Sequence, residues 1–356
     1  MDGRAPQIPD WHAACSAFGA VRILLGLTGI ALILFVVYDV LWTTLRLAGA
    51  GPLTSWVTDA FWRLALRLVP THRMLAVAGF AIVLFTVTLW IGLDWLGWTL
   101  VMSLDPRAVV ASQGGQPASL GARAYFAGSL LITVGNSEYR PGGRVWQLVS
   151  DLAAANGFTL VSLIITYLLP LVSAVRQRRE MSVYVTTLGQ NPHDVLLRAW
   201  NGSGFGRLGD HLLGLTAPMV SLGQGHLAYP VLHCFHSSDW EAALAPSLAI
   251  LDEALTLLEG VAPELRPDPV VLYPLRGAIK QLLSTLAEAH VEPEQVPPRP
   301  PSLQALREAG IRTVSDEEMV RQVAALSKHR RLMLGLVEDE GWQWRDVMEP
   351  AGNSRR

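Results

Sequence analysis

Residues 126–141 read FAGSLLITVGNSEYRP, and this stretch decides how the chain folds. It begins with apolar and small residues, passes through Thr133-Val134-Gly135-Asn136 and reaches an acidic residue at Glu138. The apolar part is too short to cross a bilayer, which takes about 20 residues. It nevertheless lies between two segments that are long enough to cross. This arrangement predicts a half-crossing helix followed by non-helical backbone, which a membrane tolerates only where protein or a water-filled cavity covers it.

The composition indicates a membrane protein. The chain has 356 residues, of which 51% are hydrophobic and 16% charged, and its mean hydropathy is +0.31. Soluble domains carry about a quarter of charged residues. The net charge of -2 and the lack of any Lys/Arg-rich block exclude a typical nucleic-acid-binding protein. The two cysteines, Cys15 and Cys234, cannot pair within a chain if they lie on opposite sides of a membrane, so no disulfide framework is expected.

Three segments are long and apolar enough to act as transmembrane helices. The first occupies residues 23–47, and at 1.5 Å per residue its roughly 23 apolar residues cross a hydrocarbon core about 30 Å thick. The second begins at residue 74 and ends near Asp94, where Trp residues cluster as they do at headgroup level. The third covers residues 152–175. Residues 1–22 lack the pattern of a secretory signal and are expected to form an extracellular lead-in.

One ionisable residue, Asp39, lies inside the first predicted span. A carboxylate at membrane depth costs about 2.5–3.5 kcal/mol on insertion scales, so it requires a partner or water. Two interpretations remain open. Asp39 either makes an interhelical or ion-path contact, or lies close enough to the cytoplasmic interface to be hydrated.

Residues 48–73 have a different pattern. Gly49, Gly51 and Pro52 end the first helix, and apolar residues then recur at helical three-four spacing with charged residues on the opposite face. This pattern predicts an amphipathic helix that lies in the cytoplasmic membrane interface.

The arginines predict the orientation of the chain. Arg63, Arg67 and Arg73 follow the first span, and a further cluster begins at Arg176 after the third. The positive-inside rule places both groups in the cytoplasm. The N-terminus is then outside, the C-terminus is cytoplasmic, and the loop that holds Thr133 enters from the outside of a plasma (inner) membrane.

Residues 74–179 resemble the pore domain of the potassium-channel-like pore-loop superfamily. The order of an outer helix, an exposed loop at 103–121, a short pore helix, a Thr-Val-Gly run and an inner helix is that of a bacterial two-transmembrane channel, here with an extra N-terminal span. In this family, backbone carbonyls and the threonine hydroxyl replace the hydration shell of a cation. The resemblance implies that the ion selectivity filter consists of Thr133, Val134, Gly135, Asn136, Ser137 and Glu138.

The resemblance also implies an assembly and a gate. A filter needs four loops and the chain has no internal repeat, so a homotetramer in the lipid bilayer is expected. The resemblance implies no cofactor and no metal other than the permeant ion, which is K⁺ or, in the non-selective alternative, also Na⁺. Gly157 and Pro170 are gating hinge candidates in the inner helix, although either can serve packing alone. Hydroxyl residues of this helix suit either a wet cavity or close helix packing: Thr159, Ser162 and Thr166.

The filter departs from the selective potassium-channel pattern. Selective filters read Thr-Val-Gly-Tyr-Gly-Asp, and this chain reads Thr-Val-Gly-Asn-Ser-Glu. Ser137 replaces a glycine that adopts positive φ without steric cost, so the outer half of the filter is expected to have another shape. The resemblance still implies a passive K⁺ channel. The alternatives are a non-selective Na⁺/K⁺ channel with only the inner sites intact, and a non-conducting membrane receptor or scaffold with a vestigial pore.

Residues 180–356 have a soluble composition and are predicted to form an α-helical cytoplasmic domain, whose regulator the sequence does not identify. Residues 291–301 are rich in proline and predict a stiff linker. The periodicity of the apolar residues predicts helices over residues 192–200, 208–222, 240–258, 270–289 and 315–337.

Two motifs in this half suggest other chemistry. Residues 204–209 match GxGxxG, but the residues before them predict a helix rather than a strand, so a flexible turn is expected instead of a nucleotide site. His226, His233, Cys234 and His236 do not have the spacing of a zinc site. No catalytic motif is present, and we do not expect an enzyme.

Overall fold

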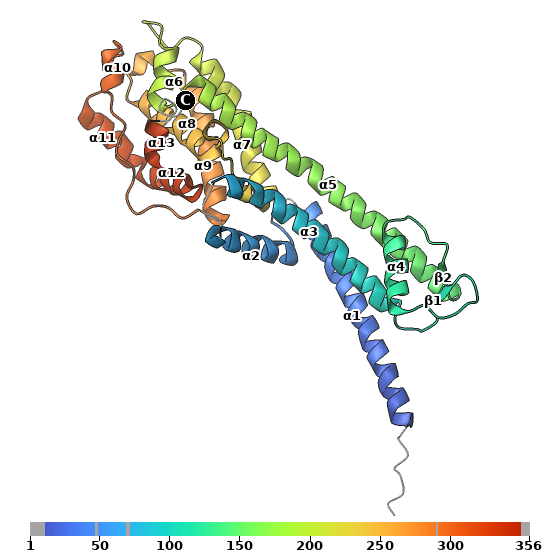
Figure 1. Cartoon of the computed structure of the whole chain (residues 1–356). Helices are drawn as coiled ribbons and strands as arrows, with labels where there is room; N and C mark the ends of the chain where they lie inside the picture. Colours follow the sequence, from blue (N-terminus) through green and yellow to red (C-terminus); the bar gives the residue numbers. More distant parts are fainter. Residues whose placement is uncertain (1–10, 47–48, 69–71, 290, 350–356) are drawn as a thin grey trace, which may run out of the picture. The chain divides into compact units, whose positions relative to one another are not determined.

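The computed structural model describes residues 11–46, 49–68, 72–289 and 291–349. These residues are mostly helical, and Figure 1 shows their order along the chain. The side chains of Cys15, Arg67 and Arg73 lie outside what the structure describes, as do residues 1–10 of the predicted lead-in. The elements are α1 (Trp11–Leu45), α2 (Pro52–Leu68), α3 (His72–Val101), β1 (Val109–Ala111), α4 (Leu120–Leu131), β2 (Tyr139–Pro141), α5 (Arg144–Leu188), α6 (Pro192–Ala199), α7 (Leu208–Ala228), η1 (Pro230–Cys234), η2 (Trp240–Ala242), α8 (Leu244–Glu259), η3 (Pro263–Leu265), α9 (Pro269–Ala289), α10 (Gln304–Glu308), α11 (Asp316–Ala325), α12 (Ser327–Asp339) and α13 (Trp344–Met348).

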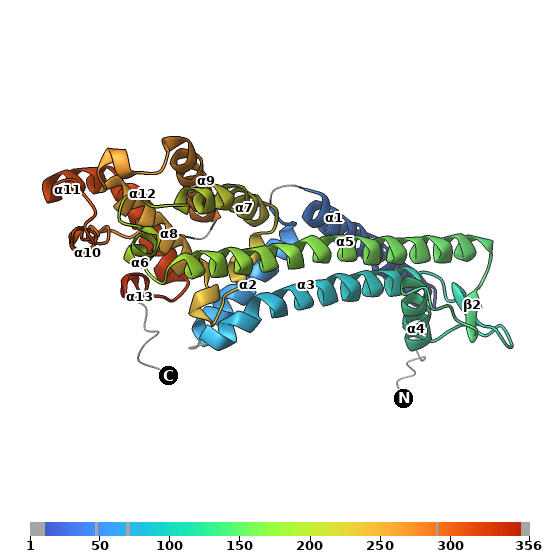
Figure 2. The same ribbon diagram turned by 90° about the horizontal axis from the view of Figure 1, so that it is seen from above.

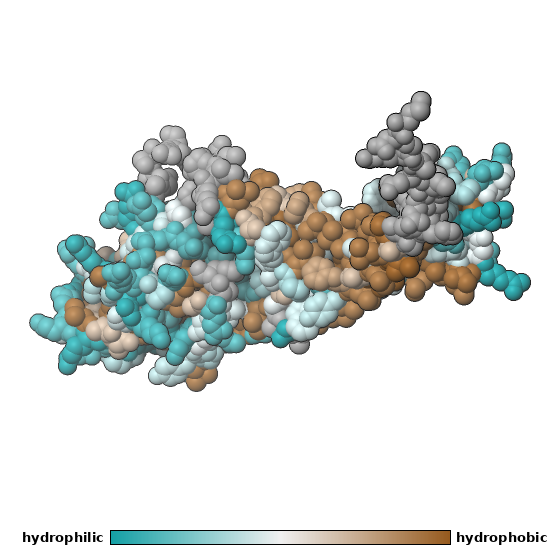
Figure 3. Space-filling model, turned by 90° about the horizontal axis from the view of Figure 1, so that it is seen from below, coloured by the Kyte–Doolittle hydropathy of each residue, from teal (hydrophilic) through white to brown (hydrophobic). Residues whose placement is uncertain are grey.

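Three helices are long and apolar enough to cross a membrane, which confirms the prediction of an α-helical membrane protein. Their candidate spans are Gly19–Leu45, Val77–Val101 and Arg144–Leu188. Many large apolar side chains on these helices are exposed, Leu34, Leu84 and Phe158 among them. Figure 3 shows such side chains as a brown surface. An exposed apolar surface of this kind is what a lipid bilayer solvates.

The predicted ends of the spans need correction. The helix α1 begins at Trp11 instead of Ile23, and α3 continues through Asp94 to Val101. Asp94 does not end its helix because it is buried and its Oδ2 accepts a hydrogen bond from Asn156 Nδ2 (2.8 Å). The third helix, α5, starts before and ends after the predicted residues 152–175. It continues past residue 175 because long unbranched side chains such as those at 176–180 favour helix.

The described residues separate into two compact units. The first comprises those within Met1–Arg46, Ala50–Trp56 and Leu84–Leu168, and the second those within Leu47–Gly49, Val57–Val83 and Leu169–Arg356. In the first unit, parts of α1, α3 and α5 lie side by side in Figures 1 and 2. They enclose a cluster of buried side chains, formed by Val36, Val40, Trp90, Leu160 and Ile164.

The predicted exposed loop at 103–121 contains structure that the sequence analysis missed. Strand β1 pairs antiparallel with β2, with Val109 opposite Pro141 and Ala111 opposite Tyr139. Val109 is buried. This small sheet ties the chain that precedes α4 to the chain that follows it. Strands of three residues have no periodicity that a sequence could reveal, and the pairing joins residues distant in the sequence.

The second unit is helical, as predicted for residues 180–356. The helix α8 lies in its core, with Leu248, Ile250, Leu251 and Leu257 almost fully buried. The helices expected at 192–200, 208–222, 240–258 and 270–289 correspond to α6, α7, α8 and α9. The helix expected at 315–337 is divided at Leu326 into α11 and α12.

The proline-rich residues 291–301 do not form a free linker. Val291, Pro298 and Pro301 are buried against the second unit. The buried Arg330 guanidinium on α12 donates from Nη1 to Pro298 O (2.8 Å) and from Nη2 to the carbonyl of residue 299 (3.0 Å). Its Nε donates to Glu253 Oε1 on α8 (2.7 Å). One buried arginine therefore fastens this segment to the centre of the domain.

We expect Arg330→Met to destabilise the protein by about 3–5 kcal/mol, because removing one partner of a buried ion pair leaves the other charge uncompensated. Burial already raises the pKa of the Glu253 carboxyl, so part of the loss should be recovered at low pH through protonation. The matched control is Arg312→Met, since the Arg312–Glu264 pair is exposed and should contribute less than about 1 kcal/mol. Thermal unfolding of the purified variants measures both changes, and equal stability of the two would contradict this role of Arg330.

Candidate functional site

The candidate site is built on α4, a helix of 12 residues. Ser119 begins it as an N-cap, and its side chain accepts a hydrogen bond from the backbone N–H of Ala122 (3.3 Å). A side-chain oxygen at this position satisfies one of the N–H groups that the first turn leaves free. Phe126, Ala127 and Leu131 are buried, so one side of α4 packs within the first unit. The helix then ends at the Thr-Val-Gly run.

The run begins with a tight C-terminal cap. The N–H of Thr133 donates to Leu130 O (3.0 Å) and the N–H of Val134 donates to Ser129 O (3.1 Å). This pair of bonds is the Schellman motif, in which a glycine usually occupies the left-handed position. Here Thr133 adopts it, with φ of 52°. A β-branched residue at positive φ is an outlier, and such strain persists where the surrounding structure imposes it.

The cap fixes the direction of two carbonyl groups. In a planar trans peptide, the C=O of one residue points opposite to the N–H of the next. Since the N–H groups of Thr133 and Val134 point back at α4, the carbonyls of Ile132 and Thr133 point away from it. Within the described part of the chain, no hydrogen bond is accepted by a carbonyl of residues 132–137. The site therefore presents a run of unused backbone oxygens.

The sign of the backbone angle φ alternates along residues 133–135. Thr133 and Gly135 have positive φ, at 52° and 80°, whereas Val134 does not. Ile132 and Val134 are 60% and 73% exposed within the single chain, so the run is accessible.

Asn136 ends this arrangement. Its Oδ1 accepts hydrogen bonds from the N–H groups of Glu138 and Tyr139, both at 2.9 Å. Such side-chain to backbone bonds reverse the chain direction in Asx turns. Ser137 does not have the positive φ of the glycine that it replaces, and the Glu138 carbonyl accepts from Ser112 N (2.8 Å) beside β1. The outer part of the run is therefore a turn into β2, as the loss of the second glycine predicted, with Glu138 exposed at its edge.

Neighbouring helices hold α4 in place. Trp95 on α3 donates from Nε1 to Ala124 O (2.7 Å), and its ring lies against Gly128, where a Cβ atom would be 3.1 Å from it. The sequence analysis assigned Trp95 to the headgroup level. Gly128 was the signal for this contact, since a glycine on a helix face allows a large ring to approach.

The hinge candidates Gly157 and Pro170 lie inside one continuous helix, α5. A Cβ atom at Gly157 would collide with the backbone of Leu131 at the end of α4. Gly157 is therefore a packing residue that brings α5 against the α4 terminus, and its role as a hinge stays a prediction. Pro170 leaves Thr166 O without its usual helical partner, close to the boundary between the two units at Leu168 and Leu169.

Asp39 is buried and accepts hydrogen bonds from the first turn of α2. Its Oδ1 lies 2.8 Å from Leu53 N, and its Oδ2 lies 2.7 Å from Thr54 Oγ1 and 2.9 Å from Trp90 Nε1. The carboxylate thus caps the positive end of α2 from within α1. Of the two interpretations left open by the sequence, the structure matches the interhelical contact. A methyl group at Gly51 would overlap this carboxylate.

The hydroxyl residues of α5 share one exposed face. Thr159, Ser162 and Thr166 each donate to the carbonyl four residues earlier, at 2.8, 2.8 and 2.9 Å. All three are exposed within the single chain. Their hydrogen bonds are satisfied internally, so the choice between a wet cavity and close packing stays open.

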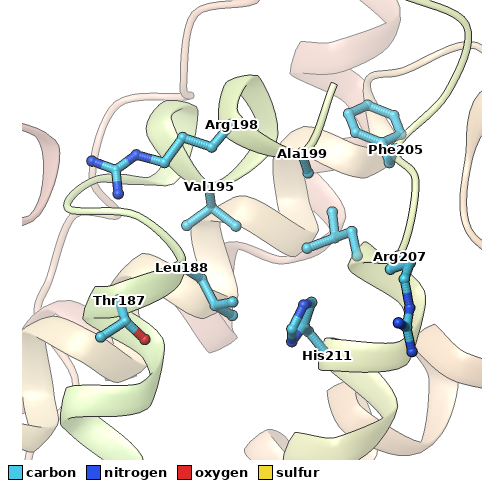
Figure 4. A pocket seen from close by; sticks show the side chains of 9 residues that line it. Thr187, Leu188, Val195, Arg198, Ala199, Phe205, Arg207 and His211 are labelled. Atoms are coloured by element: carbon cyan, nitrogen blue, oxygen red, sulfur yellow. The ribbon is translucent and has the colours of Figure 1, made fainter. Parts of the chain in front are cut away.

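The remaining motifs lie in the second unit. The GxGxxG residues 204–209 form a turn and the first two residues of α7, and the element before them is α6 rather than a strand. Phe205, Arg207 and Leu208 line a pocket of about 360 Å³ with Arg198 and His211 (Figure 4). Both arginines are already paired, Arg198 with Asp194 and Arg207 with Asp210, each at 2.8 Å.

The histidines and Cys234 do not assemble a metal centre in the part of the chain that the structure describes. His233 Nε2 lies 3.0 Å from Asp339 Oδ2, and His226 Nδ1 lies 3.0 Å from Leu222 O. Burial lowers the pKa of His236 to about 4 and raises the pKa of the Cys234 thiol to about 12. Both are therefore neutral at physiological pH.

The chain is 31% identical over 331 residues to the uncharacterized membrane protein YdjJ of Bacillus subtilis (strain 168). The similarity covers 92% of this chain and 97% of YdjJ, so it extends over both units. The chain belongs to the YdjJ family of membrane proteins. This membership and the apolar helices assign the protein to a membrane. No protein-family model matches the sequence, and no solved structure is similar to it.

The close approach of α5 to α4 generates a testable prediction. We expect Gly157→Ala to displace the end of α4 and to lower the melting temperature of the protein in nanodiscs, since the added methyl meets the Leu131 carbonyl. The matched control is Gly92→Ala in α3, where the space around the glycine is open. Alanine favours helix over glycine by up to about 1 kcal/mol, so the control should leave the melting temperature unchanged or raise it. Equal effects of both substitutions would contradict the packing role of Gly157.

Proposed function

We propose that four copies of this chain form a cation channel, with residues 133–138 as its selectivity filter and K⁺ as its permeant ion. The observation that carries the proposal is the run of backbone carbonyls at residues 132–137, which accept no hydrogen bond in the described part of the chain. Buried or apolar surroundings penalise such oxygens unless a partner replaces water. A partly dehydrated cation is such a partner, and filters of carbonyl oxygens coordinate one.

The helix α4 supports the same proposal. The C-terminal end of a helix carries about half a negative elementary charge, and the cap at Thr133 directs the carbonyls of Ile132 and Thr133 away from that end. A cation near these oxygens therefore interacts favourably with the helix dipole as well. In this proposal α4 is a re-entrant pore helix, and α3 and α5 are the outer and inner helices of the pore.

The exposure of the run supports a homotetramer. Ile132 and Val134 are large apolar residues that the single chain leaves 60% and 73% exposed. One chain supplies only one loop and cannot surround an ion, whereas four loops related by cyclic symmetry can. The exposed apolar side chains would then contact neighbouring subunits or the pore.

The charge distribution supports the expected orientation in a plasma membrane. Arg176 and Arg179 on α5 have side chains that are 75% and 63% exposed. The positive-inside rule places these residues and the helical domain of residues 180–356 in the cytoplasm. The Thr-Val-Gly run then enters from the outside, and Glu138 lies at the external mouth, where a ring of carboxylates concentrates cations.

A non-selective Na⁺/K⁺ channel is the second candidate, and Asn136 favours it. Its side chain holds the N–H groups of Glu138 and Tyr139, which turns the chain toward β2 instead of extending the row of carbonyls. Fewer ordered sites discriminate less between K⁺ and Na⁺. In this candidate only the oxygens at Thr133 and Val134 coordinate the ion.

Flux measurements on the purified protein in liposomes test both candidates. We expect K⁺ flux that Gly135→Asp reduces to the level of empty liposomes, because the side chain enters the row of oxygens and positive φ disfavours any residue but glycine. The matched control is Gly143→Asp, which lies in open space outside the run and should conduct normally. Flux through Gly135→Asp equal to that of the native chain would refute the pore. A preference for K⁺ of about tenfold or more supports the first candidate, and equal K⁺ and Na⁺ flux supports the second.

The assembly has its own test. Chemical crosslinking of the native protein in nanodiscs or mild detergent should give a four-chain species as the largest product, since a closed ring of loops requires it. The Gly143→Asp control should give the same product. A protein that stays monomeric at every crosslinker concentration would rule out the proposed filter.

A further inference from the structure

The second unit contains an apolar cavity that the proposed pore does not use. It lies between α8, α9 and α11 and has a volume of about 470 Å³. Small-molecule sites occupy about 300–1,000 Å³ and combine apolar walls with a few polar groups. The apolar wall here includes Leu255, Leu272, Leu326 and the ring of Tyr273. Tyr273 is 75% exposed, so its ring is available to cover a bound molecule.

Arg266 is the cation of this cavity that lacks an acidic partner. Its Nε donates to Val261 O (2.7 Å) and its Nη2 donates to Glu259 O (2.6 Å), so two backbone carbonyls orient the guanidinium. None of the ion pairs among the described residues includes it. It is half-buried against apolar walls, where a charge-assisted hydrogen bond is stronger than at an open surface.

The other charged groups of the cavity already bind one another. Arg276 donates from Nη1 to Asp252 Oδ1 (2.9 Å) and from Nη2 to Glu259 Oε1 (2.8 Å). The buried Asp252 Oδ1 also lies 3.0 Å from His329 Nε2. Arg276 is thus shared between two carboxylates, which leaves Arg266 as the group free to bind an anion.

A second polar group of the wall is also unused. The side-chain Oε1 of Gln322 is buried and accepts no hydrogen bond among the described residues, while its Nε2 donates to Glu318 Oε1 (3.0 Å). A buried acceptor without a hydrogen-bond partner is unfavourable, because it has lost its bonds to water without gaining others. A molecule in the cavity that carries a hydroxyl or N–H group can supply the missing donor.

We propose that this cavity binds a small organic acid, with its carboxylate on Arg266, its apolar or aromatic body against Leu255, Leu272 and Tyr273, and a donor group on Gln322. The pocket in Figure 4 is a weaker candidate because Arg198 and Arg207 pair with aspartates on their own helices. The cavity belongs to the predicted cytoplasmic domain. The proposal therefore assigns a class of ligand, small organic acids, to that domain, and it does not depend on whether the membrane part conducts ions.

Titration calorimetry of the full-length protein in nanodiscs tests the proposal with indole-3-propionate, which combines a carboxylate, an aromatic body and an N–H donor. The neutral 3-(3-indolyl)propanol and the cationic 3-(3-indolyl)propylamine keep the ring and chain and change only the charge. We expect the acid to bind one molecule per chain, at least about tenfold more tightly than either analogue, because only the acid forms a charge-assisted bond with Arg266. Empty nanodiscs measure partitioning into lipid.

Variants locate the bound acid. Arg266→Gln should weaken binding at least about tenfold and Arg266→Lys should weaken it less, since lysine keeps the charge but not the fork of donors. The matched control Arg312→Gln removes an arginine that is exposed and paired with Glu264, and should change the affinity less than twofold. Leu272→Trp should fill the cavity and weaken binding without removing the charge. No heat above empty nanodiscs, equal binding of the neutral analogue, or unchanged binding in both Arg266→Gln and Leu272→Trp would overturn the proposal.

Discussion

Two backbone N–H groups, those of Thr133 and Val134, hold the end of α4 and set the geometry of the candidate site. They bond the last carbonyls of the helix, and planarity of the trans peptide then turns the carbonyls of Ile132 and Thr133 outward. The cap requires a left-handed residue, and the chain places a threonine there instead of a glycine. The strain is held by packing, because Trp95 supports one side of α4 and Gly157 lets α5 contact its terminus.

The elements that follow from local periodicity could be predicted from the sequence. The three spans and most helices of the second unit were found, because the apolar residues of a helix recur within a single window of sequence, although the three long helices extend beyond their predicted ends. Ser137 in place of a glycine predicted only that the outer run has another shape, whereas the turn itself depends on the hydrogen bonds of Asn136.

Features that depend on distant residues could not be predicted. The β1–β2 pairing, the acceptor role of Asp39 and the contact of Gly157 with Leu131 each join residues whose proximity no local pattern encodes. The proline-rich composition of residues 291–301 predicts a stiff linker, whereas the position of these residues depends on hydrogen bonds from Arg330. A single arginine in an amphipathic helix gives no sign of such a partner.

The helix α5 takes part in both units of the protein. Its first part packs on α3 and α4, and its later part contributes Met181 and Val185 to the core of the second unit. There the buried Arg178 pairs with Glu340 and donates to Leu232 O (2.8 Å). Removing either charge would leave the other buried and uncompensated, so the end of α5 is integrated into the helical domain rather than loosely attached to it.

The burial of Asp39 has a consequence for the biogenesis of the protein. An isolated α1 would carry an unpaired carboxylate into the bilayer, at a cost of about 2.5–3.5 kcal/mol. That cost is offset only when the first turn of α2 and the Trp90 indole supply their hydrogen bonds. The first span is therefore more stable in the membrane once the two later segments that supply these hydrogen bonds have been synthesised.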